Sequence, residues 1–299
     1  MRDMLLEKLR TDVNLPVLPE VLVRLDKELS DPEVEVRSIS SIIGMDPILA
    51  GQVLRMANSA YYSRGGAALT NSGAAVMRLG IRTVRGLVYA LSLPRMFTSP
   101  ARGQAFSHSM FWKHSLGVGA FSQALGRKLG IPAASQDLVY FAGLVHDVGA
   151  LLFLALIPEK YDAFLASLEK EGQESVLKPQ DFNLAIKETE VFGISHCELG
   201  ATFLEERWKM EPALVELVRD HHSPDWNRQE LLRESLIVHV ADGVCSSVGA
   251  SWESASRQSL PFLAPAWEHL EISLDDVNEL LEQMQASLDQ AQALLVMQS

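Results

Sequence analysis

The 299-residue chain has little cysteine and lacks the features of a secreted protein. Only Cys197 and Cys245 are present, which excludes a disulfide framework and fits a reducing compartment. The first residues, Met1 to Lys8, are too few and too charged for a secretory signal peptide. We therefore expect a cytoplasmic protein.

Strand patterns are also scarce. No alternating apolar and polar segment is closed by a tight Asn-Gly or Asp-Gly hairpin. Helix starts recur instead, since Ser30-Asp31-Pro32 and Asp46-Pro47 both place proline just after an N-cap residue. Ser195–Glu198 and Ser273–Asp276 are capping-box patterns, and the first of them places His196 at the start of a helix. The sequence predicts an all-α protein.

Carboxylates are missing from a long stretch of the first half. No Asp or Glu lies between Asp46 and Asp137, whereas ten Lys and Arg do. Within it Arg78, Arg82 and Arg85 are spaced at i, i+4 and i+7 and are expected to share one helical face. That face could bind an anion such as a phosphorylated ligand, or it could pack beside the acidic remainder of the chain or lie in solvent.

Positive charge is too sparse for a nucleic-acid-binding protein. The formal net charge is −12 at pH 7, which opposes a broad contact with phosphates. No cluster of aromatic and basic residues forms a platform for stacking bases. Nucleic acid is therefore an unlikely partner.

Long hydrophobic runs are limited to one segment, from Leu138 to Ile157. Its length would suffice for a membrane span, but Asp147 would lie at mid-membrane and the mean hydropathy of the chain is only +0.08. We interpret the segment as a helix buried on all sides in a large core, and we expect no membrane contact. His146 and Asp147 in its centre would cost several kcal/mol unless a side chain or a metal ion pairs with them.

Further residues of metal-ligating type lie elsewhere in the chain. They are His114, His196, His221, His222 and Asp242. A single residue of these types is more often a hydrogen-bonded core or surface residue than a metal ligand. We interpret three other histidines, His108, His239 and His269, in that way. Spacing alone leaves open whether the others meet at one metal site.

The chain divides into three predicted sections. Residues 1–104 form an N-terminal helical subdomain, and residues 105–250 form a helical core that contains every ligand candidate. Residues 251–299 form a linker and an amphipathic helix from Leu274 to about Met297. The apolar stripe of this helix could dock on the core, which we favour, or could form a homodimer.

The order of these motifs resembles the HD superfamily of metal-dependent phosphohydrolases, including its HD-GYP phosphodiesterases, and most closely the HDOD branch. The segments that carry the resemblance are Leu15–Pro19, Asp46–Leu49, Leu54–Tyr61, Ala75–Gly80, Phe111–Ser115, Gly143–Gly149 and His196–Gly200. It covers roughly residues 10–250. It implies an all-helical, HD-domain-like bundle with an N-terminal helical subdomain, in bacterial signal transduction.

The resemblance also implies a metal site. His114, His146, Asp147 and Asp242 would hold one ion, and Asp147 would bridge to a second ion held by His196, His221 and His222. One or two divalent ions are expected, and imidazole with carboxylate suits iron, manganese, nickel or zinc. Two such ions could activate a bridging hydroxide near Asp147 for displacement at phosphorus.

Three departures from HD-GYP enzymes argue against hydrolysis of cyclic dinucleotides. Ala150 stands in place of a lysine, Met110 in place of an acidic ligand, and Ser223–Trp226 in place of the Gly-Tyr-Pro signature. We therefore favour a regulatory module that binds a signalling protein. The alternative is an active metal-dependent phosphohydrolase that acts on a nucleotide or another phosphorylated small molecule.

Overall fold

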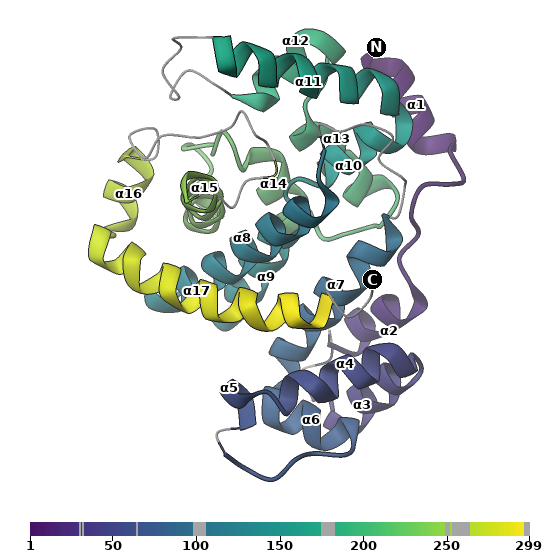
Figure 1. Ribbon diagram of the computed structural model, residues 1–299, viewed down its shortest axis with the longest axis vertical. Helices are drawn as coiled ribbons and strands as arrows, with labels where there is room; N and C mark the ends of the chain where they lie inside the picture. Colours follow the sequence, from purple (N-terminus) through teal and green to yellow (C-terminus); the bar gives the residue numbers. More distant parts are fainter. Residues whose placement is uncertain are drawn as a thin grey trace. The chain divides into compact units, whose positions relative to one another are not determined.

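The structure is a computed structural model that describes residues 1–29, 31, 33–63, 65–97, 106–174, 183–248, 252 and 264–295. Side chains are not described at residues 60–61, 82, 171–174 and 286–295. All regular structure in these ranges is helical, which confirms the predicted all-α class. The chain forms two compact units (Figure 1), a larger one of residues 1–15 and 99–288 and a smaller one of residues 16–98 and 289–299.

The larger unit holds most of the helices. They are α1 (Arg2–Thr11), α8 (His108–Lys128), α9 (Ala133–Val145), α10 (Val148–Leu156), α11 (Pro158–Glu174), α12 (Leu184–Phe192), α13 (His196–Glu206), α14 (Pro212–Asp220), α15 (Leu232–Ser247) and α16 (Ala264–Leu270). The last helix, α17 (Leu274–Leu295), belongs to this unit as far as Leu288. At its centre α8 packs against α9 and α15, while α10 packs against α13 and α13 against α14. Helix α1 contacts α10 and α13, so it belongs to this unit rather than to an N-terminal section.

The smaller unit is built from shorter helices. They are α2 (Glu20–Leu29), α3 (Val36–Gly44), α4 (Pro47–Ala57), α5 (Ala60–Ser63), α6 (Ser72–Leu79) and α7 (Ile81–Met96). Helix α6 packs against both α3 and α4 and closes a small apolar core of its own.

Most of the predicted helix starts are confirmed. The Asp46 side chain accepts hydrogen bonds from the backbone N–H groups of Ile48 and Leu49 at the start of α4. Ser195 caps α13, and Ser273 and Asp276 cap each other's backbone N–H groups at the start of α17. The start predicted at residues 30–32 is wrong where the structure describes it, because residues 31 and 33–35 are not helical and α3 begins after Glu35.

The predicted arginine face is also wrong. Gly80 has a φ of +83°, which ends α6 and begins α7 in a new direction. Arg78 therefore lies on α6, whereas Arg82 and Arg85 lie on α7.

The apolar segment around His146 is a pair of helices rather than one. α9 ends at Val145 and α10 begins at Val148, so His146 and Asp147 form the turn between them. The segment Ala133–Leu156 is long and apolar enough to cross a membrane, but 83% of its most apolar window is buried inside the protein. It forms the core of the larger unit, as the sequence indicated.

The first half of α17 docks on the larger unit. Val277, Leu280 and Met284 are buried, and Lys128 of α8 pairs with Asp276 and Glu279 of α17 at 2.8 and 3.0 Å. Docking was the favoured expectation for this helix. Homodimerisation through it remains a prediction.

Candidate metal centre

The seven predicted ligand residues converge in the larger unit. His114 comes from the middle of α8 and Asp242 from α15, while the other five lie at helix ends. Their side chains form groups that share members, and within each group the ligand atoms lie within 4.8 Å of one another. All are at most 4% exposed except His222, which is 10% exposed.

Close helix contacts make this convergence possible. A Cβ atom on Gly143 of α9 would lie 2.8 Å from Gly119 of α8, so glycine allows the two backbones to meet near His114 and His146. A Cβ on Gly149 would lie 1.9 Å from the carbonyl oxygen of His196. Only glycine at position 149 lets the start of α10 touch the start of α13, and this contact brings Asp147 beside His196.

His114, His146 and Asp242 form the first group. His114 Nε2 lies 3.2 Å from His146 Nε2 and 3.2 Å from Asp242 Oδ1. Asp147 Oδ2 adds a carboxylate oxygen 3.1 Å from His146 Nε2. This group combines imidazole and carboxylate, a donor set suited to iron, manganese, nickel or zinc.

His196, His221 and His222 form the second group, together with Cys197. The Nε2 atoms of His196 and His221 are 3.4 Å apart. Asp147 Oδ1 lies 3.2 Å from the first of these atoms and 3.6 Å from the second. The two oxygens of Asp147 therefore face different groups.

The ring nitrogens are oriented as in metal-binding histidines. The Nδ1–H groups of His146 and His221 donate to the carbonyl oxygens of Gly143 and Val218, both at 2.7 Å. Because a carbonyl oxygen accepts from Nδ1–H of each ring, Nε2 is the nitrogen that faces the cluster, and it can bind an ion once it is unprotonated. Such outer partners orient ligating histidines in metalloproteins.

Glu188 on α12 contacts the cluster, and the sequence analysis missed it. It is fully buried, and its Oε2 accepts hydrogen bonds from both Nδ1 and the backbone N–H of His196, each at 2.6 Å. The Tyr161 hydroxyl donates to the other oxygen at 2.6 Å. The carboxylate thus fixes the ring of His196. A clue was available, because Glu188 lies four residues from both Leu184 and Phe192, on the buried face of α12.

Trp252 and His239 also support the cluster without having been predicted to do so. The indole N–H of Trp252 donates to Asp147 Oδ2 at 2.6 Å, and its ring packs against Phe106 and Phe111 as an apolar cover. His239, which we interpreted as a hydrogen-bonded core histidine, lies 2.8 Å through Nδ1 from the carbonyl oxygen of His221. Neither contact leaves a pattern in the sequence.

Burial and mutual charge set the protonation of the cluster. Burial would raise the pKa of Asp147, but the surrounding imidazoles, His146 first, hold that pKa well below its ordinary value. Burial would lower the pKa of His196, but Cys197 and Glu188 outweigh it and the pKa is raised. Burial acts to raise the pKa of the Cys197 thiol, yet His196 and His221 lower it to about 7. The cluster therefore favours carboxylate and thiolate anions balanced by positive charge.

The residues fit a metal ion. Among the described residues no donor makes a hydrogen bond to Asp147 Oδ1 or Asp242 Oδ2, although both atoms are buried beside imidazoles. A buried carboxylate oxygen in this position costs free energy unless a cation balances it. The inward Nε2 atoms and these two oxygens are the donors that a divalent ion requires.

Two of the three predicted anion-binding arginines bind partners other than the ligand residues. In the smaller unit, Arg78 donates to the carbonyl oxygens of Ala57 and Ala67, and Arg85 pairs with Asp26 at 3.2 Å. The side chain of Arg82 lies outside the described part of the chain. The partners of Arg78 and Arg85 all lie before residue 100 and not in the acidic remainder of the chain. Anion binding by these arginines stays a prediction.

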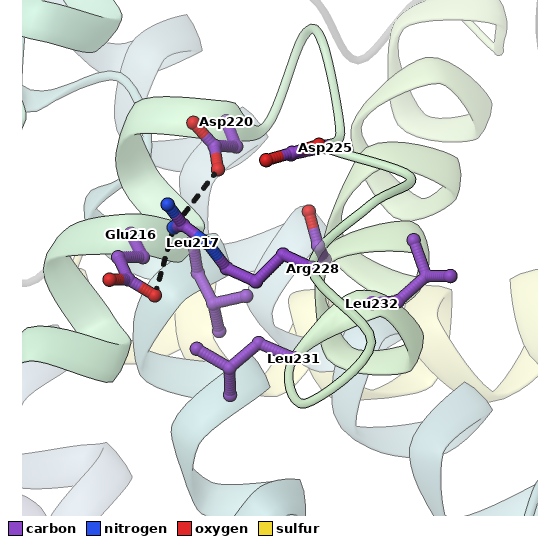
Figure 2. A pocket seen from close by; sticks show the side chains of 8 residues that line it. Glu216, Leu217, Asp220, Asp225, Arg228, Leu231 and Leu232 are labelled. Atoms are coloured by element: carbon purple, nitrogen blue, oxygen red, sulfur yellow. Dashed lines mark ion pairs between the residues drawn. The ribbon is translucent and has the colours of Figure 1, made fainter.

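A surface pocket lies beside the end of α14, apart from the ligand groups. Figure 2 shows Arg228 reaching across it to Glu216 and Asp220, with N–O distances of 3.0 and 3.7 Å. Asp225 adds a third carboxylate to the lining. Because acidic groups outnumber the one arginine, which is already paired, this pocket does not suit an anionic phosphoester.

Comparisons with known proteins agree with the fold. The profile of the HDOD domain family matches residues 15–224. An uncharacterized protein of Treponema pallidum (strain Nichols) is 26% identical over 210 residues, which are 70% of this chain and 38% of that protein. The chain thus spans well under half the length of this relative.

Solved structures show the same architecture. An HDOD domain protein of unknown function from Geobacter sulfurreducens aligns with a TM-score of 0.76 at 23% identity, covering 98% of this chain and 99% of that chain. A protein from Shewanella amazonensis SB2B, provisionally named a phosphohydrolase, aligns with 0.70 at 23% identity over 97% and 98%. A protein from Marinobacter aquaeolei VT8, provisionally named a signal transduction protein, aligns with 0.73 at 21% identity over 99% and 65%.

Proposed function

This chain belongs to the HDOD domain family, and we propose that it is a regulatory module of bacterial signal transduction built around a His/Asp metal site. In this proposal the metal holds the helices of the larger unit in one arrangement. The module acts by binding a signalling protein and not by turning over a substrate.

The inward orientation of the histidine rings carries this proposal. Each of His146, His196 and His221 has its Nδ1 at an acceptor 2.6 to 2.7 Å away, and each Nε2 faces the cluster. Histidine rings that only made ordinary hydrogen bonds in the core would have no reason to direct their Nε2 atoms toward one point. The same arrangement would place His114, His146, Asp147 and Asp242 around one ion and His196, His221 and His222 around another.

Three observations support a regulatory over a catalytic role. Residue 150 is a buried alanine, and alanine supplies no cation at the position where HD-GYP enzymes carry a lysine. Met110 lies one turn before His114 and offers no acidic ligand. Trp252 covers Asp147 and occupies one of its oxygens, which leaves little room for a polar substrate there.

Exposed apolar side chains of the smaller unit support binding of a protein partner. Ile48 and Met77 are 63% and 68% exposed, and Val17 is 74% exposed. In the core of a protein interface charged residues are depleted and methionine is enriched. We propose that a signalling protein binds this unit.

A metal-dependent phosphohydrolase is the second candidate. The observation that favours it is Asp147, whose oxygens face the two ligand groups separately. When bound, paired divalent ions supply Lewis acidity and a nucleophile for attack on phosphorus. The chain's own part would be to hold the ions and, through Glu188, to orient His196.

The decisive experiment is elemental analysis of the purified chain, combined with turnover assays. The protein is loaded with iron, manganese or zinc and tested on a panel of nucleotides and generic phosphoesters. We expect bound metal without turnover. The double variant His146→Ala/Asp147→Ala should lose the metal, and His269→Ala, an exposed histidine on α16, should keep it.

Each outcome decides between the candidates. Metal-dependent turnover that disappears in the double variant would replace the regulatory proposal by the phosphohydrolase. Wild-type protein that takes up none of the three metals would overturn both.

A further inference from the structure

Cys197 has no role in the ligand set implied by the family resemblance, yet it lies in the second group. We infer that the Cys197 thiolate is a metal ligand, and that with His196, His221 and His222 it forms a thiophilic site of the kind that binds zinc. This inference rests on the proposed metal site and specifies the chemistry of one half of it.

Two of three distances among these side chains match the edges of a tetrahedral site, the third is slightly longer, and the ligand atom of His222 lies within 4.8 Å of the others. Cys197 Sγ lies 3.4 Å from His196 Nε2 and 3.9 Å from His221 Nε2, and those two nitrogens are 3.4 Å apart. Zinc binds imidazole nitrogen at about 2.0–2.1 Å and thiolate at about 2.3 Å, so tetrahedral ligand atoms lie roughly 3.3–3.6 Å from one another. The four side chains require little movement to surround one ion.

Cys245 shows how a cysteine without this role is placed. Its Sγ lies 3.5 Å from Met284 Sδ, in the contact between α15 and α17, and the side chain is fully buried. It behaves as a small apolar group. Cys197 instead faces two imidazole nitrogens at the amino end of α13, where a thiolate is favoured by the helix terminus.

A separate observation points to a cation at this position. Asp147 Oδ1, whose side chain is 4% exposed, is directed toward the Nε2 atoms of His196 and His221 and receives no hydrogen bond from a described donor. A cation among these atoms would balance the carboxylate and the thiolate together.

The thiolate divides the centre into two unlike sites. Cys197 and the three histidines would form a four-ligand shell of the kind found in structural zinc sites, with Asp147 Oδ1 beside it as a balancing charge. The group of His114, His146 and Asp242 lacks sulfur and keeps the harder donors. The second site should therefore prefer zinc or cobalt over manganese, because thiolate selects softer ions.

Cobalt(II) substitution tests the inference directly. Thiolate bound to cobalt gives an intense charge-transfer absorption in the near ultraviolet, which imidazole and carboxylate ligands do not give. The full chain loaded with cobalt should show this band at an intensity of one thiolate per chain. Cys197→Ser should lose the band, and Cys245→Ser should keep it.

The outcomes separate this inference from the proposed function. Cobalt bound with no thiolate band in the wild type would overturn the Cys197 assignment and leave the metal site intact. A band that persists in Cys197→Ser would also overturn it. No bound cobalt or zinc would overturn both.

A second measurement needs no variant. X-ray absorption at the zinc edge of the zinc-loaded wild-type protein should contain a sulfur shell at about 2.3 Å beside the nitrogen shell. Only nitrogen and oxygen neighbours would contradict the inference, even if Cys197→Ser fails to fold.

Discussion

At the scale of single residues, Glu188 shows how a buried carboxylate can orient a candidate metal ligand without being a ligand itself. One oxygen accepts two hydrogen bonds from His196 and the other accepts one from Tyr161. An amide has a single oxygen and therefore cannot replace both acceptors. The ring of His196 would lose its fixed orientation.

We therefore expect Glu188→Gln to weaken zinc binding by about 10- to 100-fold, the usual cost of losing an outer partner of a ligating histidine. Zinc affinity is measured by competition with a chromogenic chelator. Glu190→Gln is the matched control, because Glu190 lies on the same helix, is exposed, and among the described residues pairs with Lys187 at the surface. Equal affinities for the two variants would show that Glu188 does not orient His196.

Gly149 is the residue at which backbone contact matters most. We expect Gly149→Ala to destabilise the larger unit by about 1–3 kcal/mol or more, because its Cβ would lie 1.9 Å from the carbonyl oxygen of His196. Urea denaturation measures the change in the free energy of unfolding.

The control for this substitution is Gly51→Ala on α4, where a Cβ would meet no atom within 4 Å. That variant should be neutral or more stable by about 0.5–1 kcal/mol, since alanine is the better helix former. Equal effects of the two substitutions would contradict the close contact of α10 with α13.

At the scale of elements, the ligands lie mainly where helices end. The turn between α9 and α10 presents His146 and Asp147, the first residue of α13 is His196, and the residues after α14 are His221 and His222. Backbone at a helix end is less constrained than in the interior, so adjacent side chains can point into one cluster. Two helix interiors contribute only His114 and Asp242.

We expect the docking of α17 to depend on pH through Asp276. Hydrogen bonds from Lys128 and Ser273 lower the pKa of Asp276 below its ordinary value of 3.8. A carboxyl whose pKa is lowered by folding stabilises the folded state above about pH 4, and this contribution is lost as the pH falls through the lower folded value.

We therefore expect Asp276→Asn to destabilise the protein at pH 7, with a deficit that shrinks below about pH 4. Chemical denaturation from pH 2 to 7 follows the difference from the wild type. Asp275→Asn is the control, because Asp275 shares the first turn of α17 whereas Lys128 pairs with Asp276 and Glu279. A deficit that is the same at every pH would rule out this ionisation as its source.

At the scale of the whole molecule, every candidate ligand lies in one of the two units. A ligand stabilises only the state that binds it, by about 2.7 kcal/mol at a concentration one hundred times its Kd. Zinc should therefore slow hydrogen exchange in α9, α10, α13 and α15 and leave α3, α4 and α6 of the smaller unit unchanged.

Hydrogen exchange read by mass spectrometry resolves these segments. The comparison is made with and without a chelator, and the variant His146→Ala/Asp147→Ala should show no zinc response in any of them. Equal protection of both units by zinc would show that the metal does not act on the larger unit alone.

The sequence by itself determined the helical class, through the caps at Asp46, Ser195 and Ser273 and the absence of strand patterns. It also indicated the residues of the cluster, because histidine and aspartate are rare inside apolar segments and stand out there. These features are local, and a local pattern can be interpreted without coordinates.

Only the tertiary structure decided how these residues meet. The chain turns at His146–Asp147 and at Gly80, where periodicity alone predicted continuous faces. Trp252 reaches Asp147 across 105 positions of sequence, and Cys197 faces His221 only because α13 packs against α14. Contacts of this kind arise from the packing of distant segments, and no spacing within the chain encodes them.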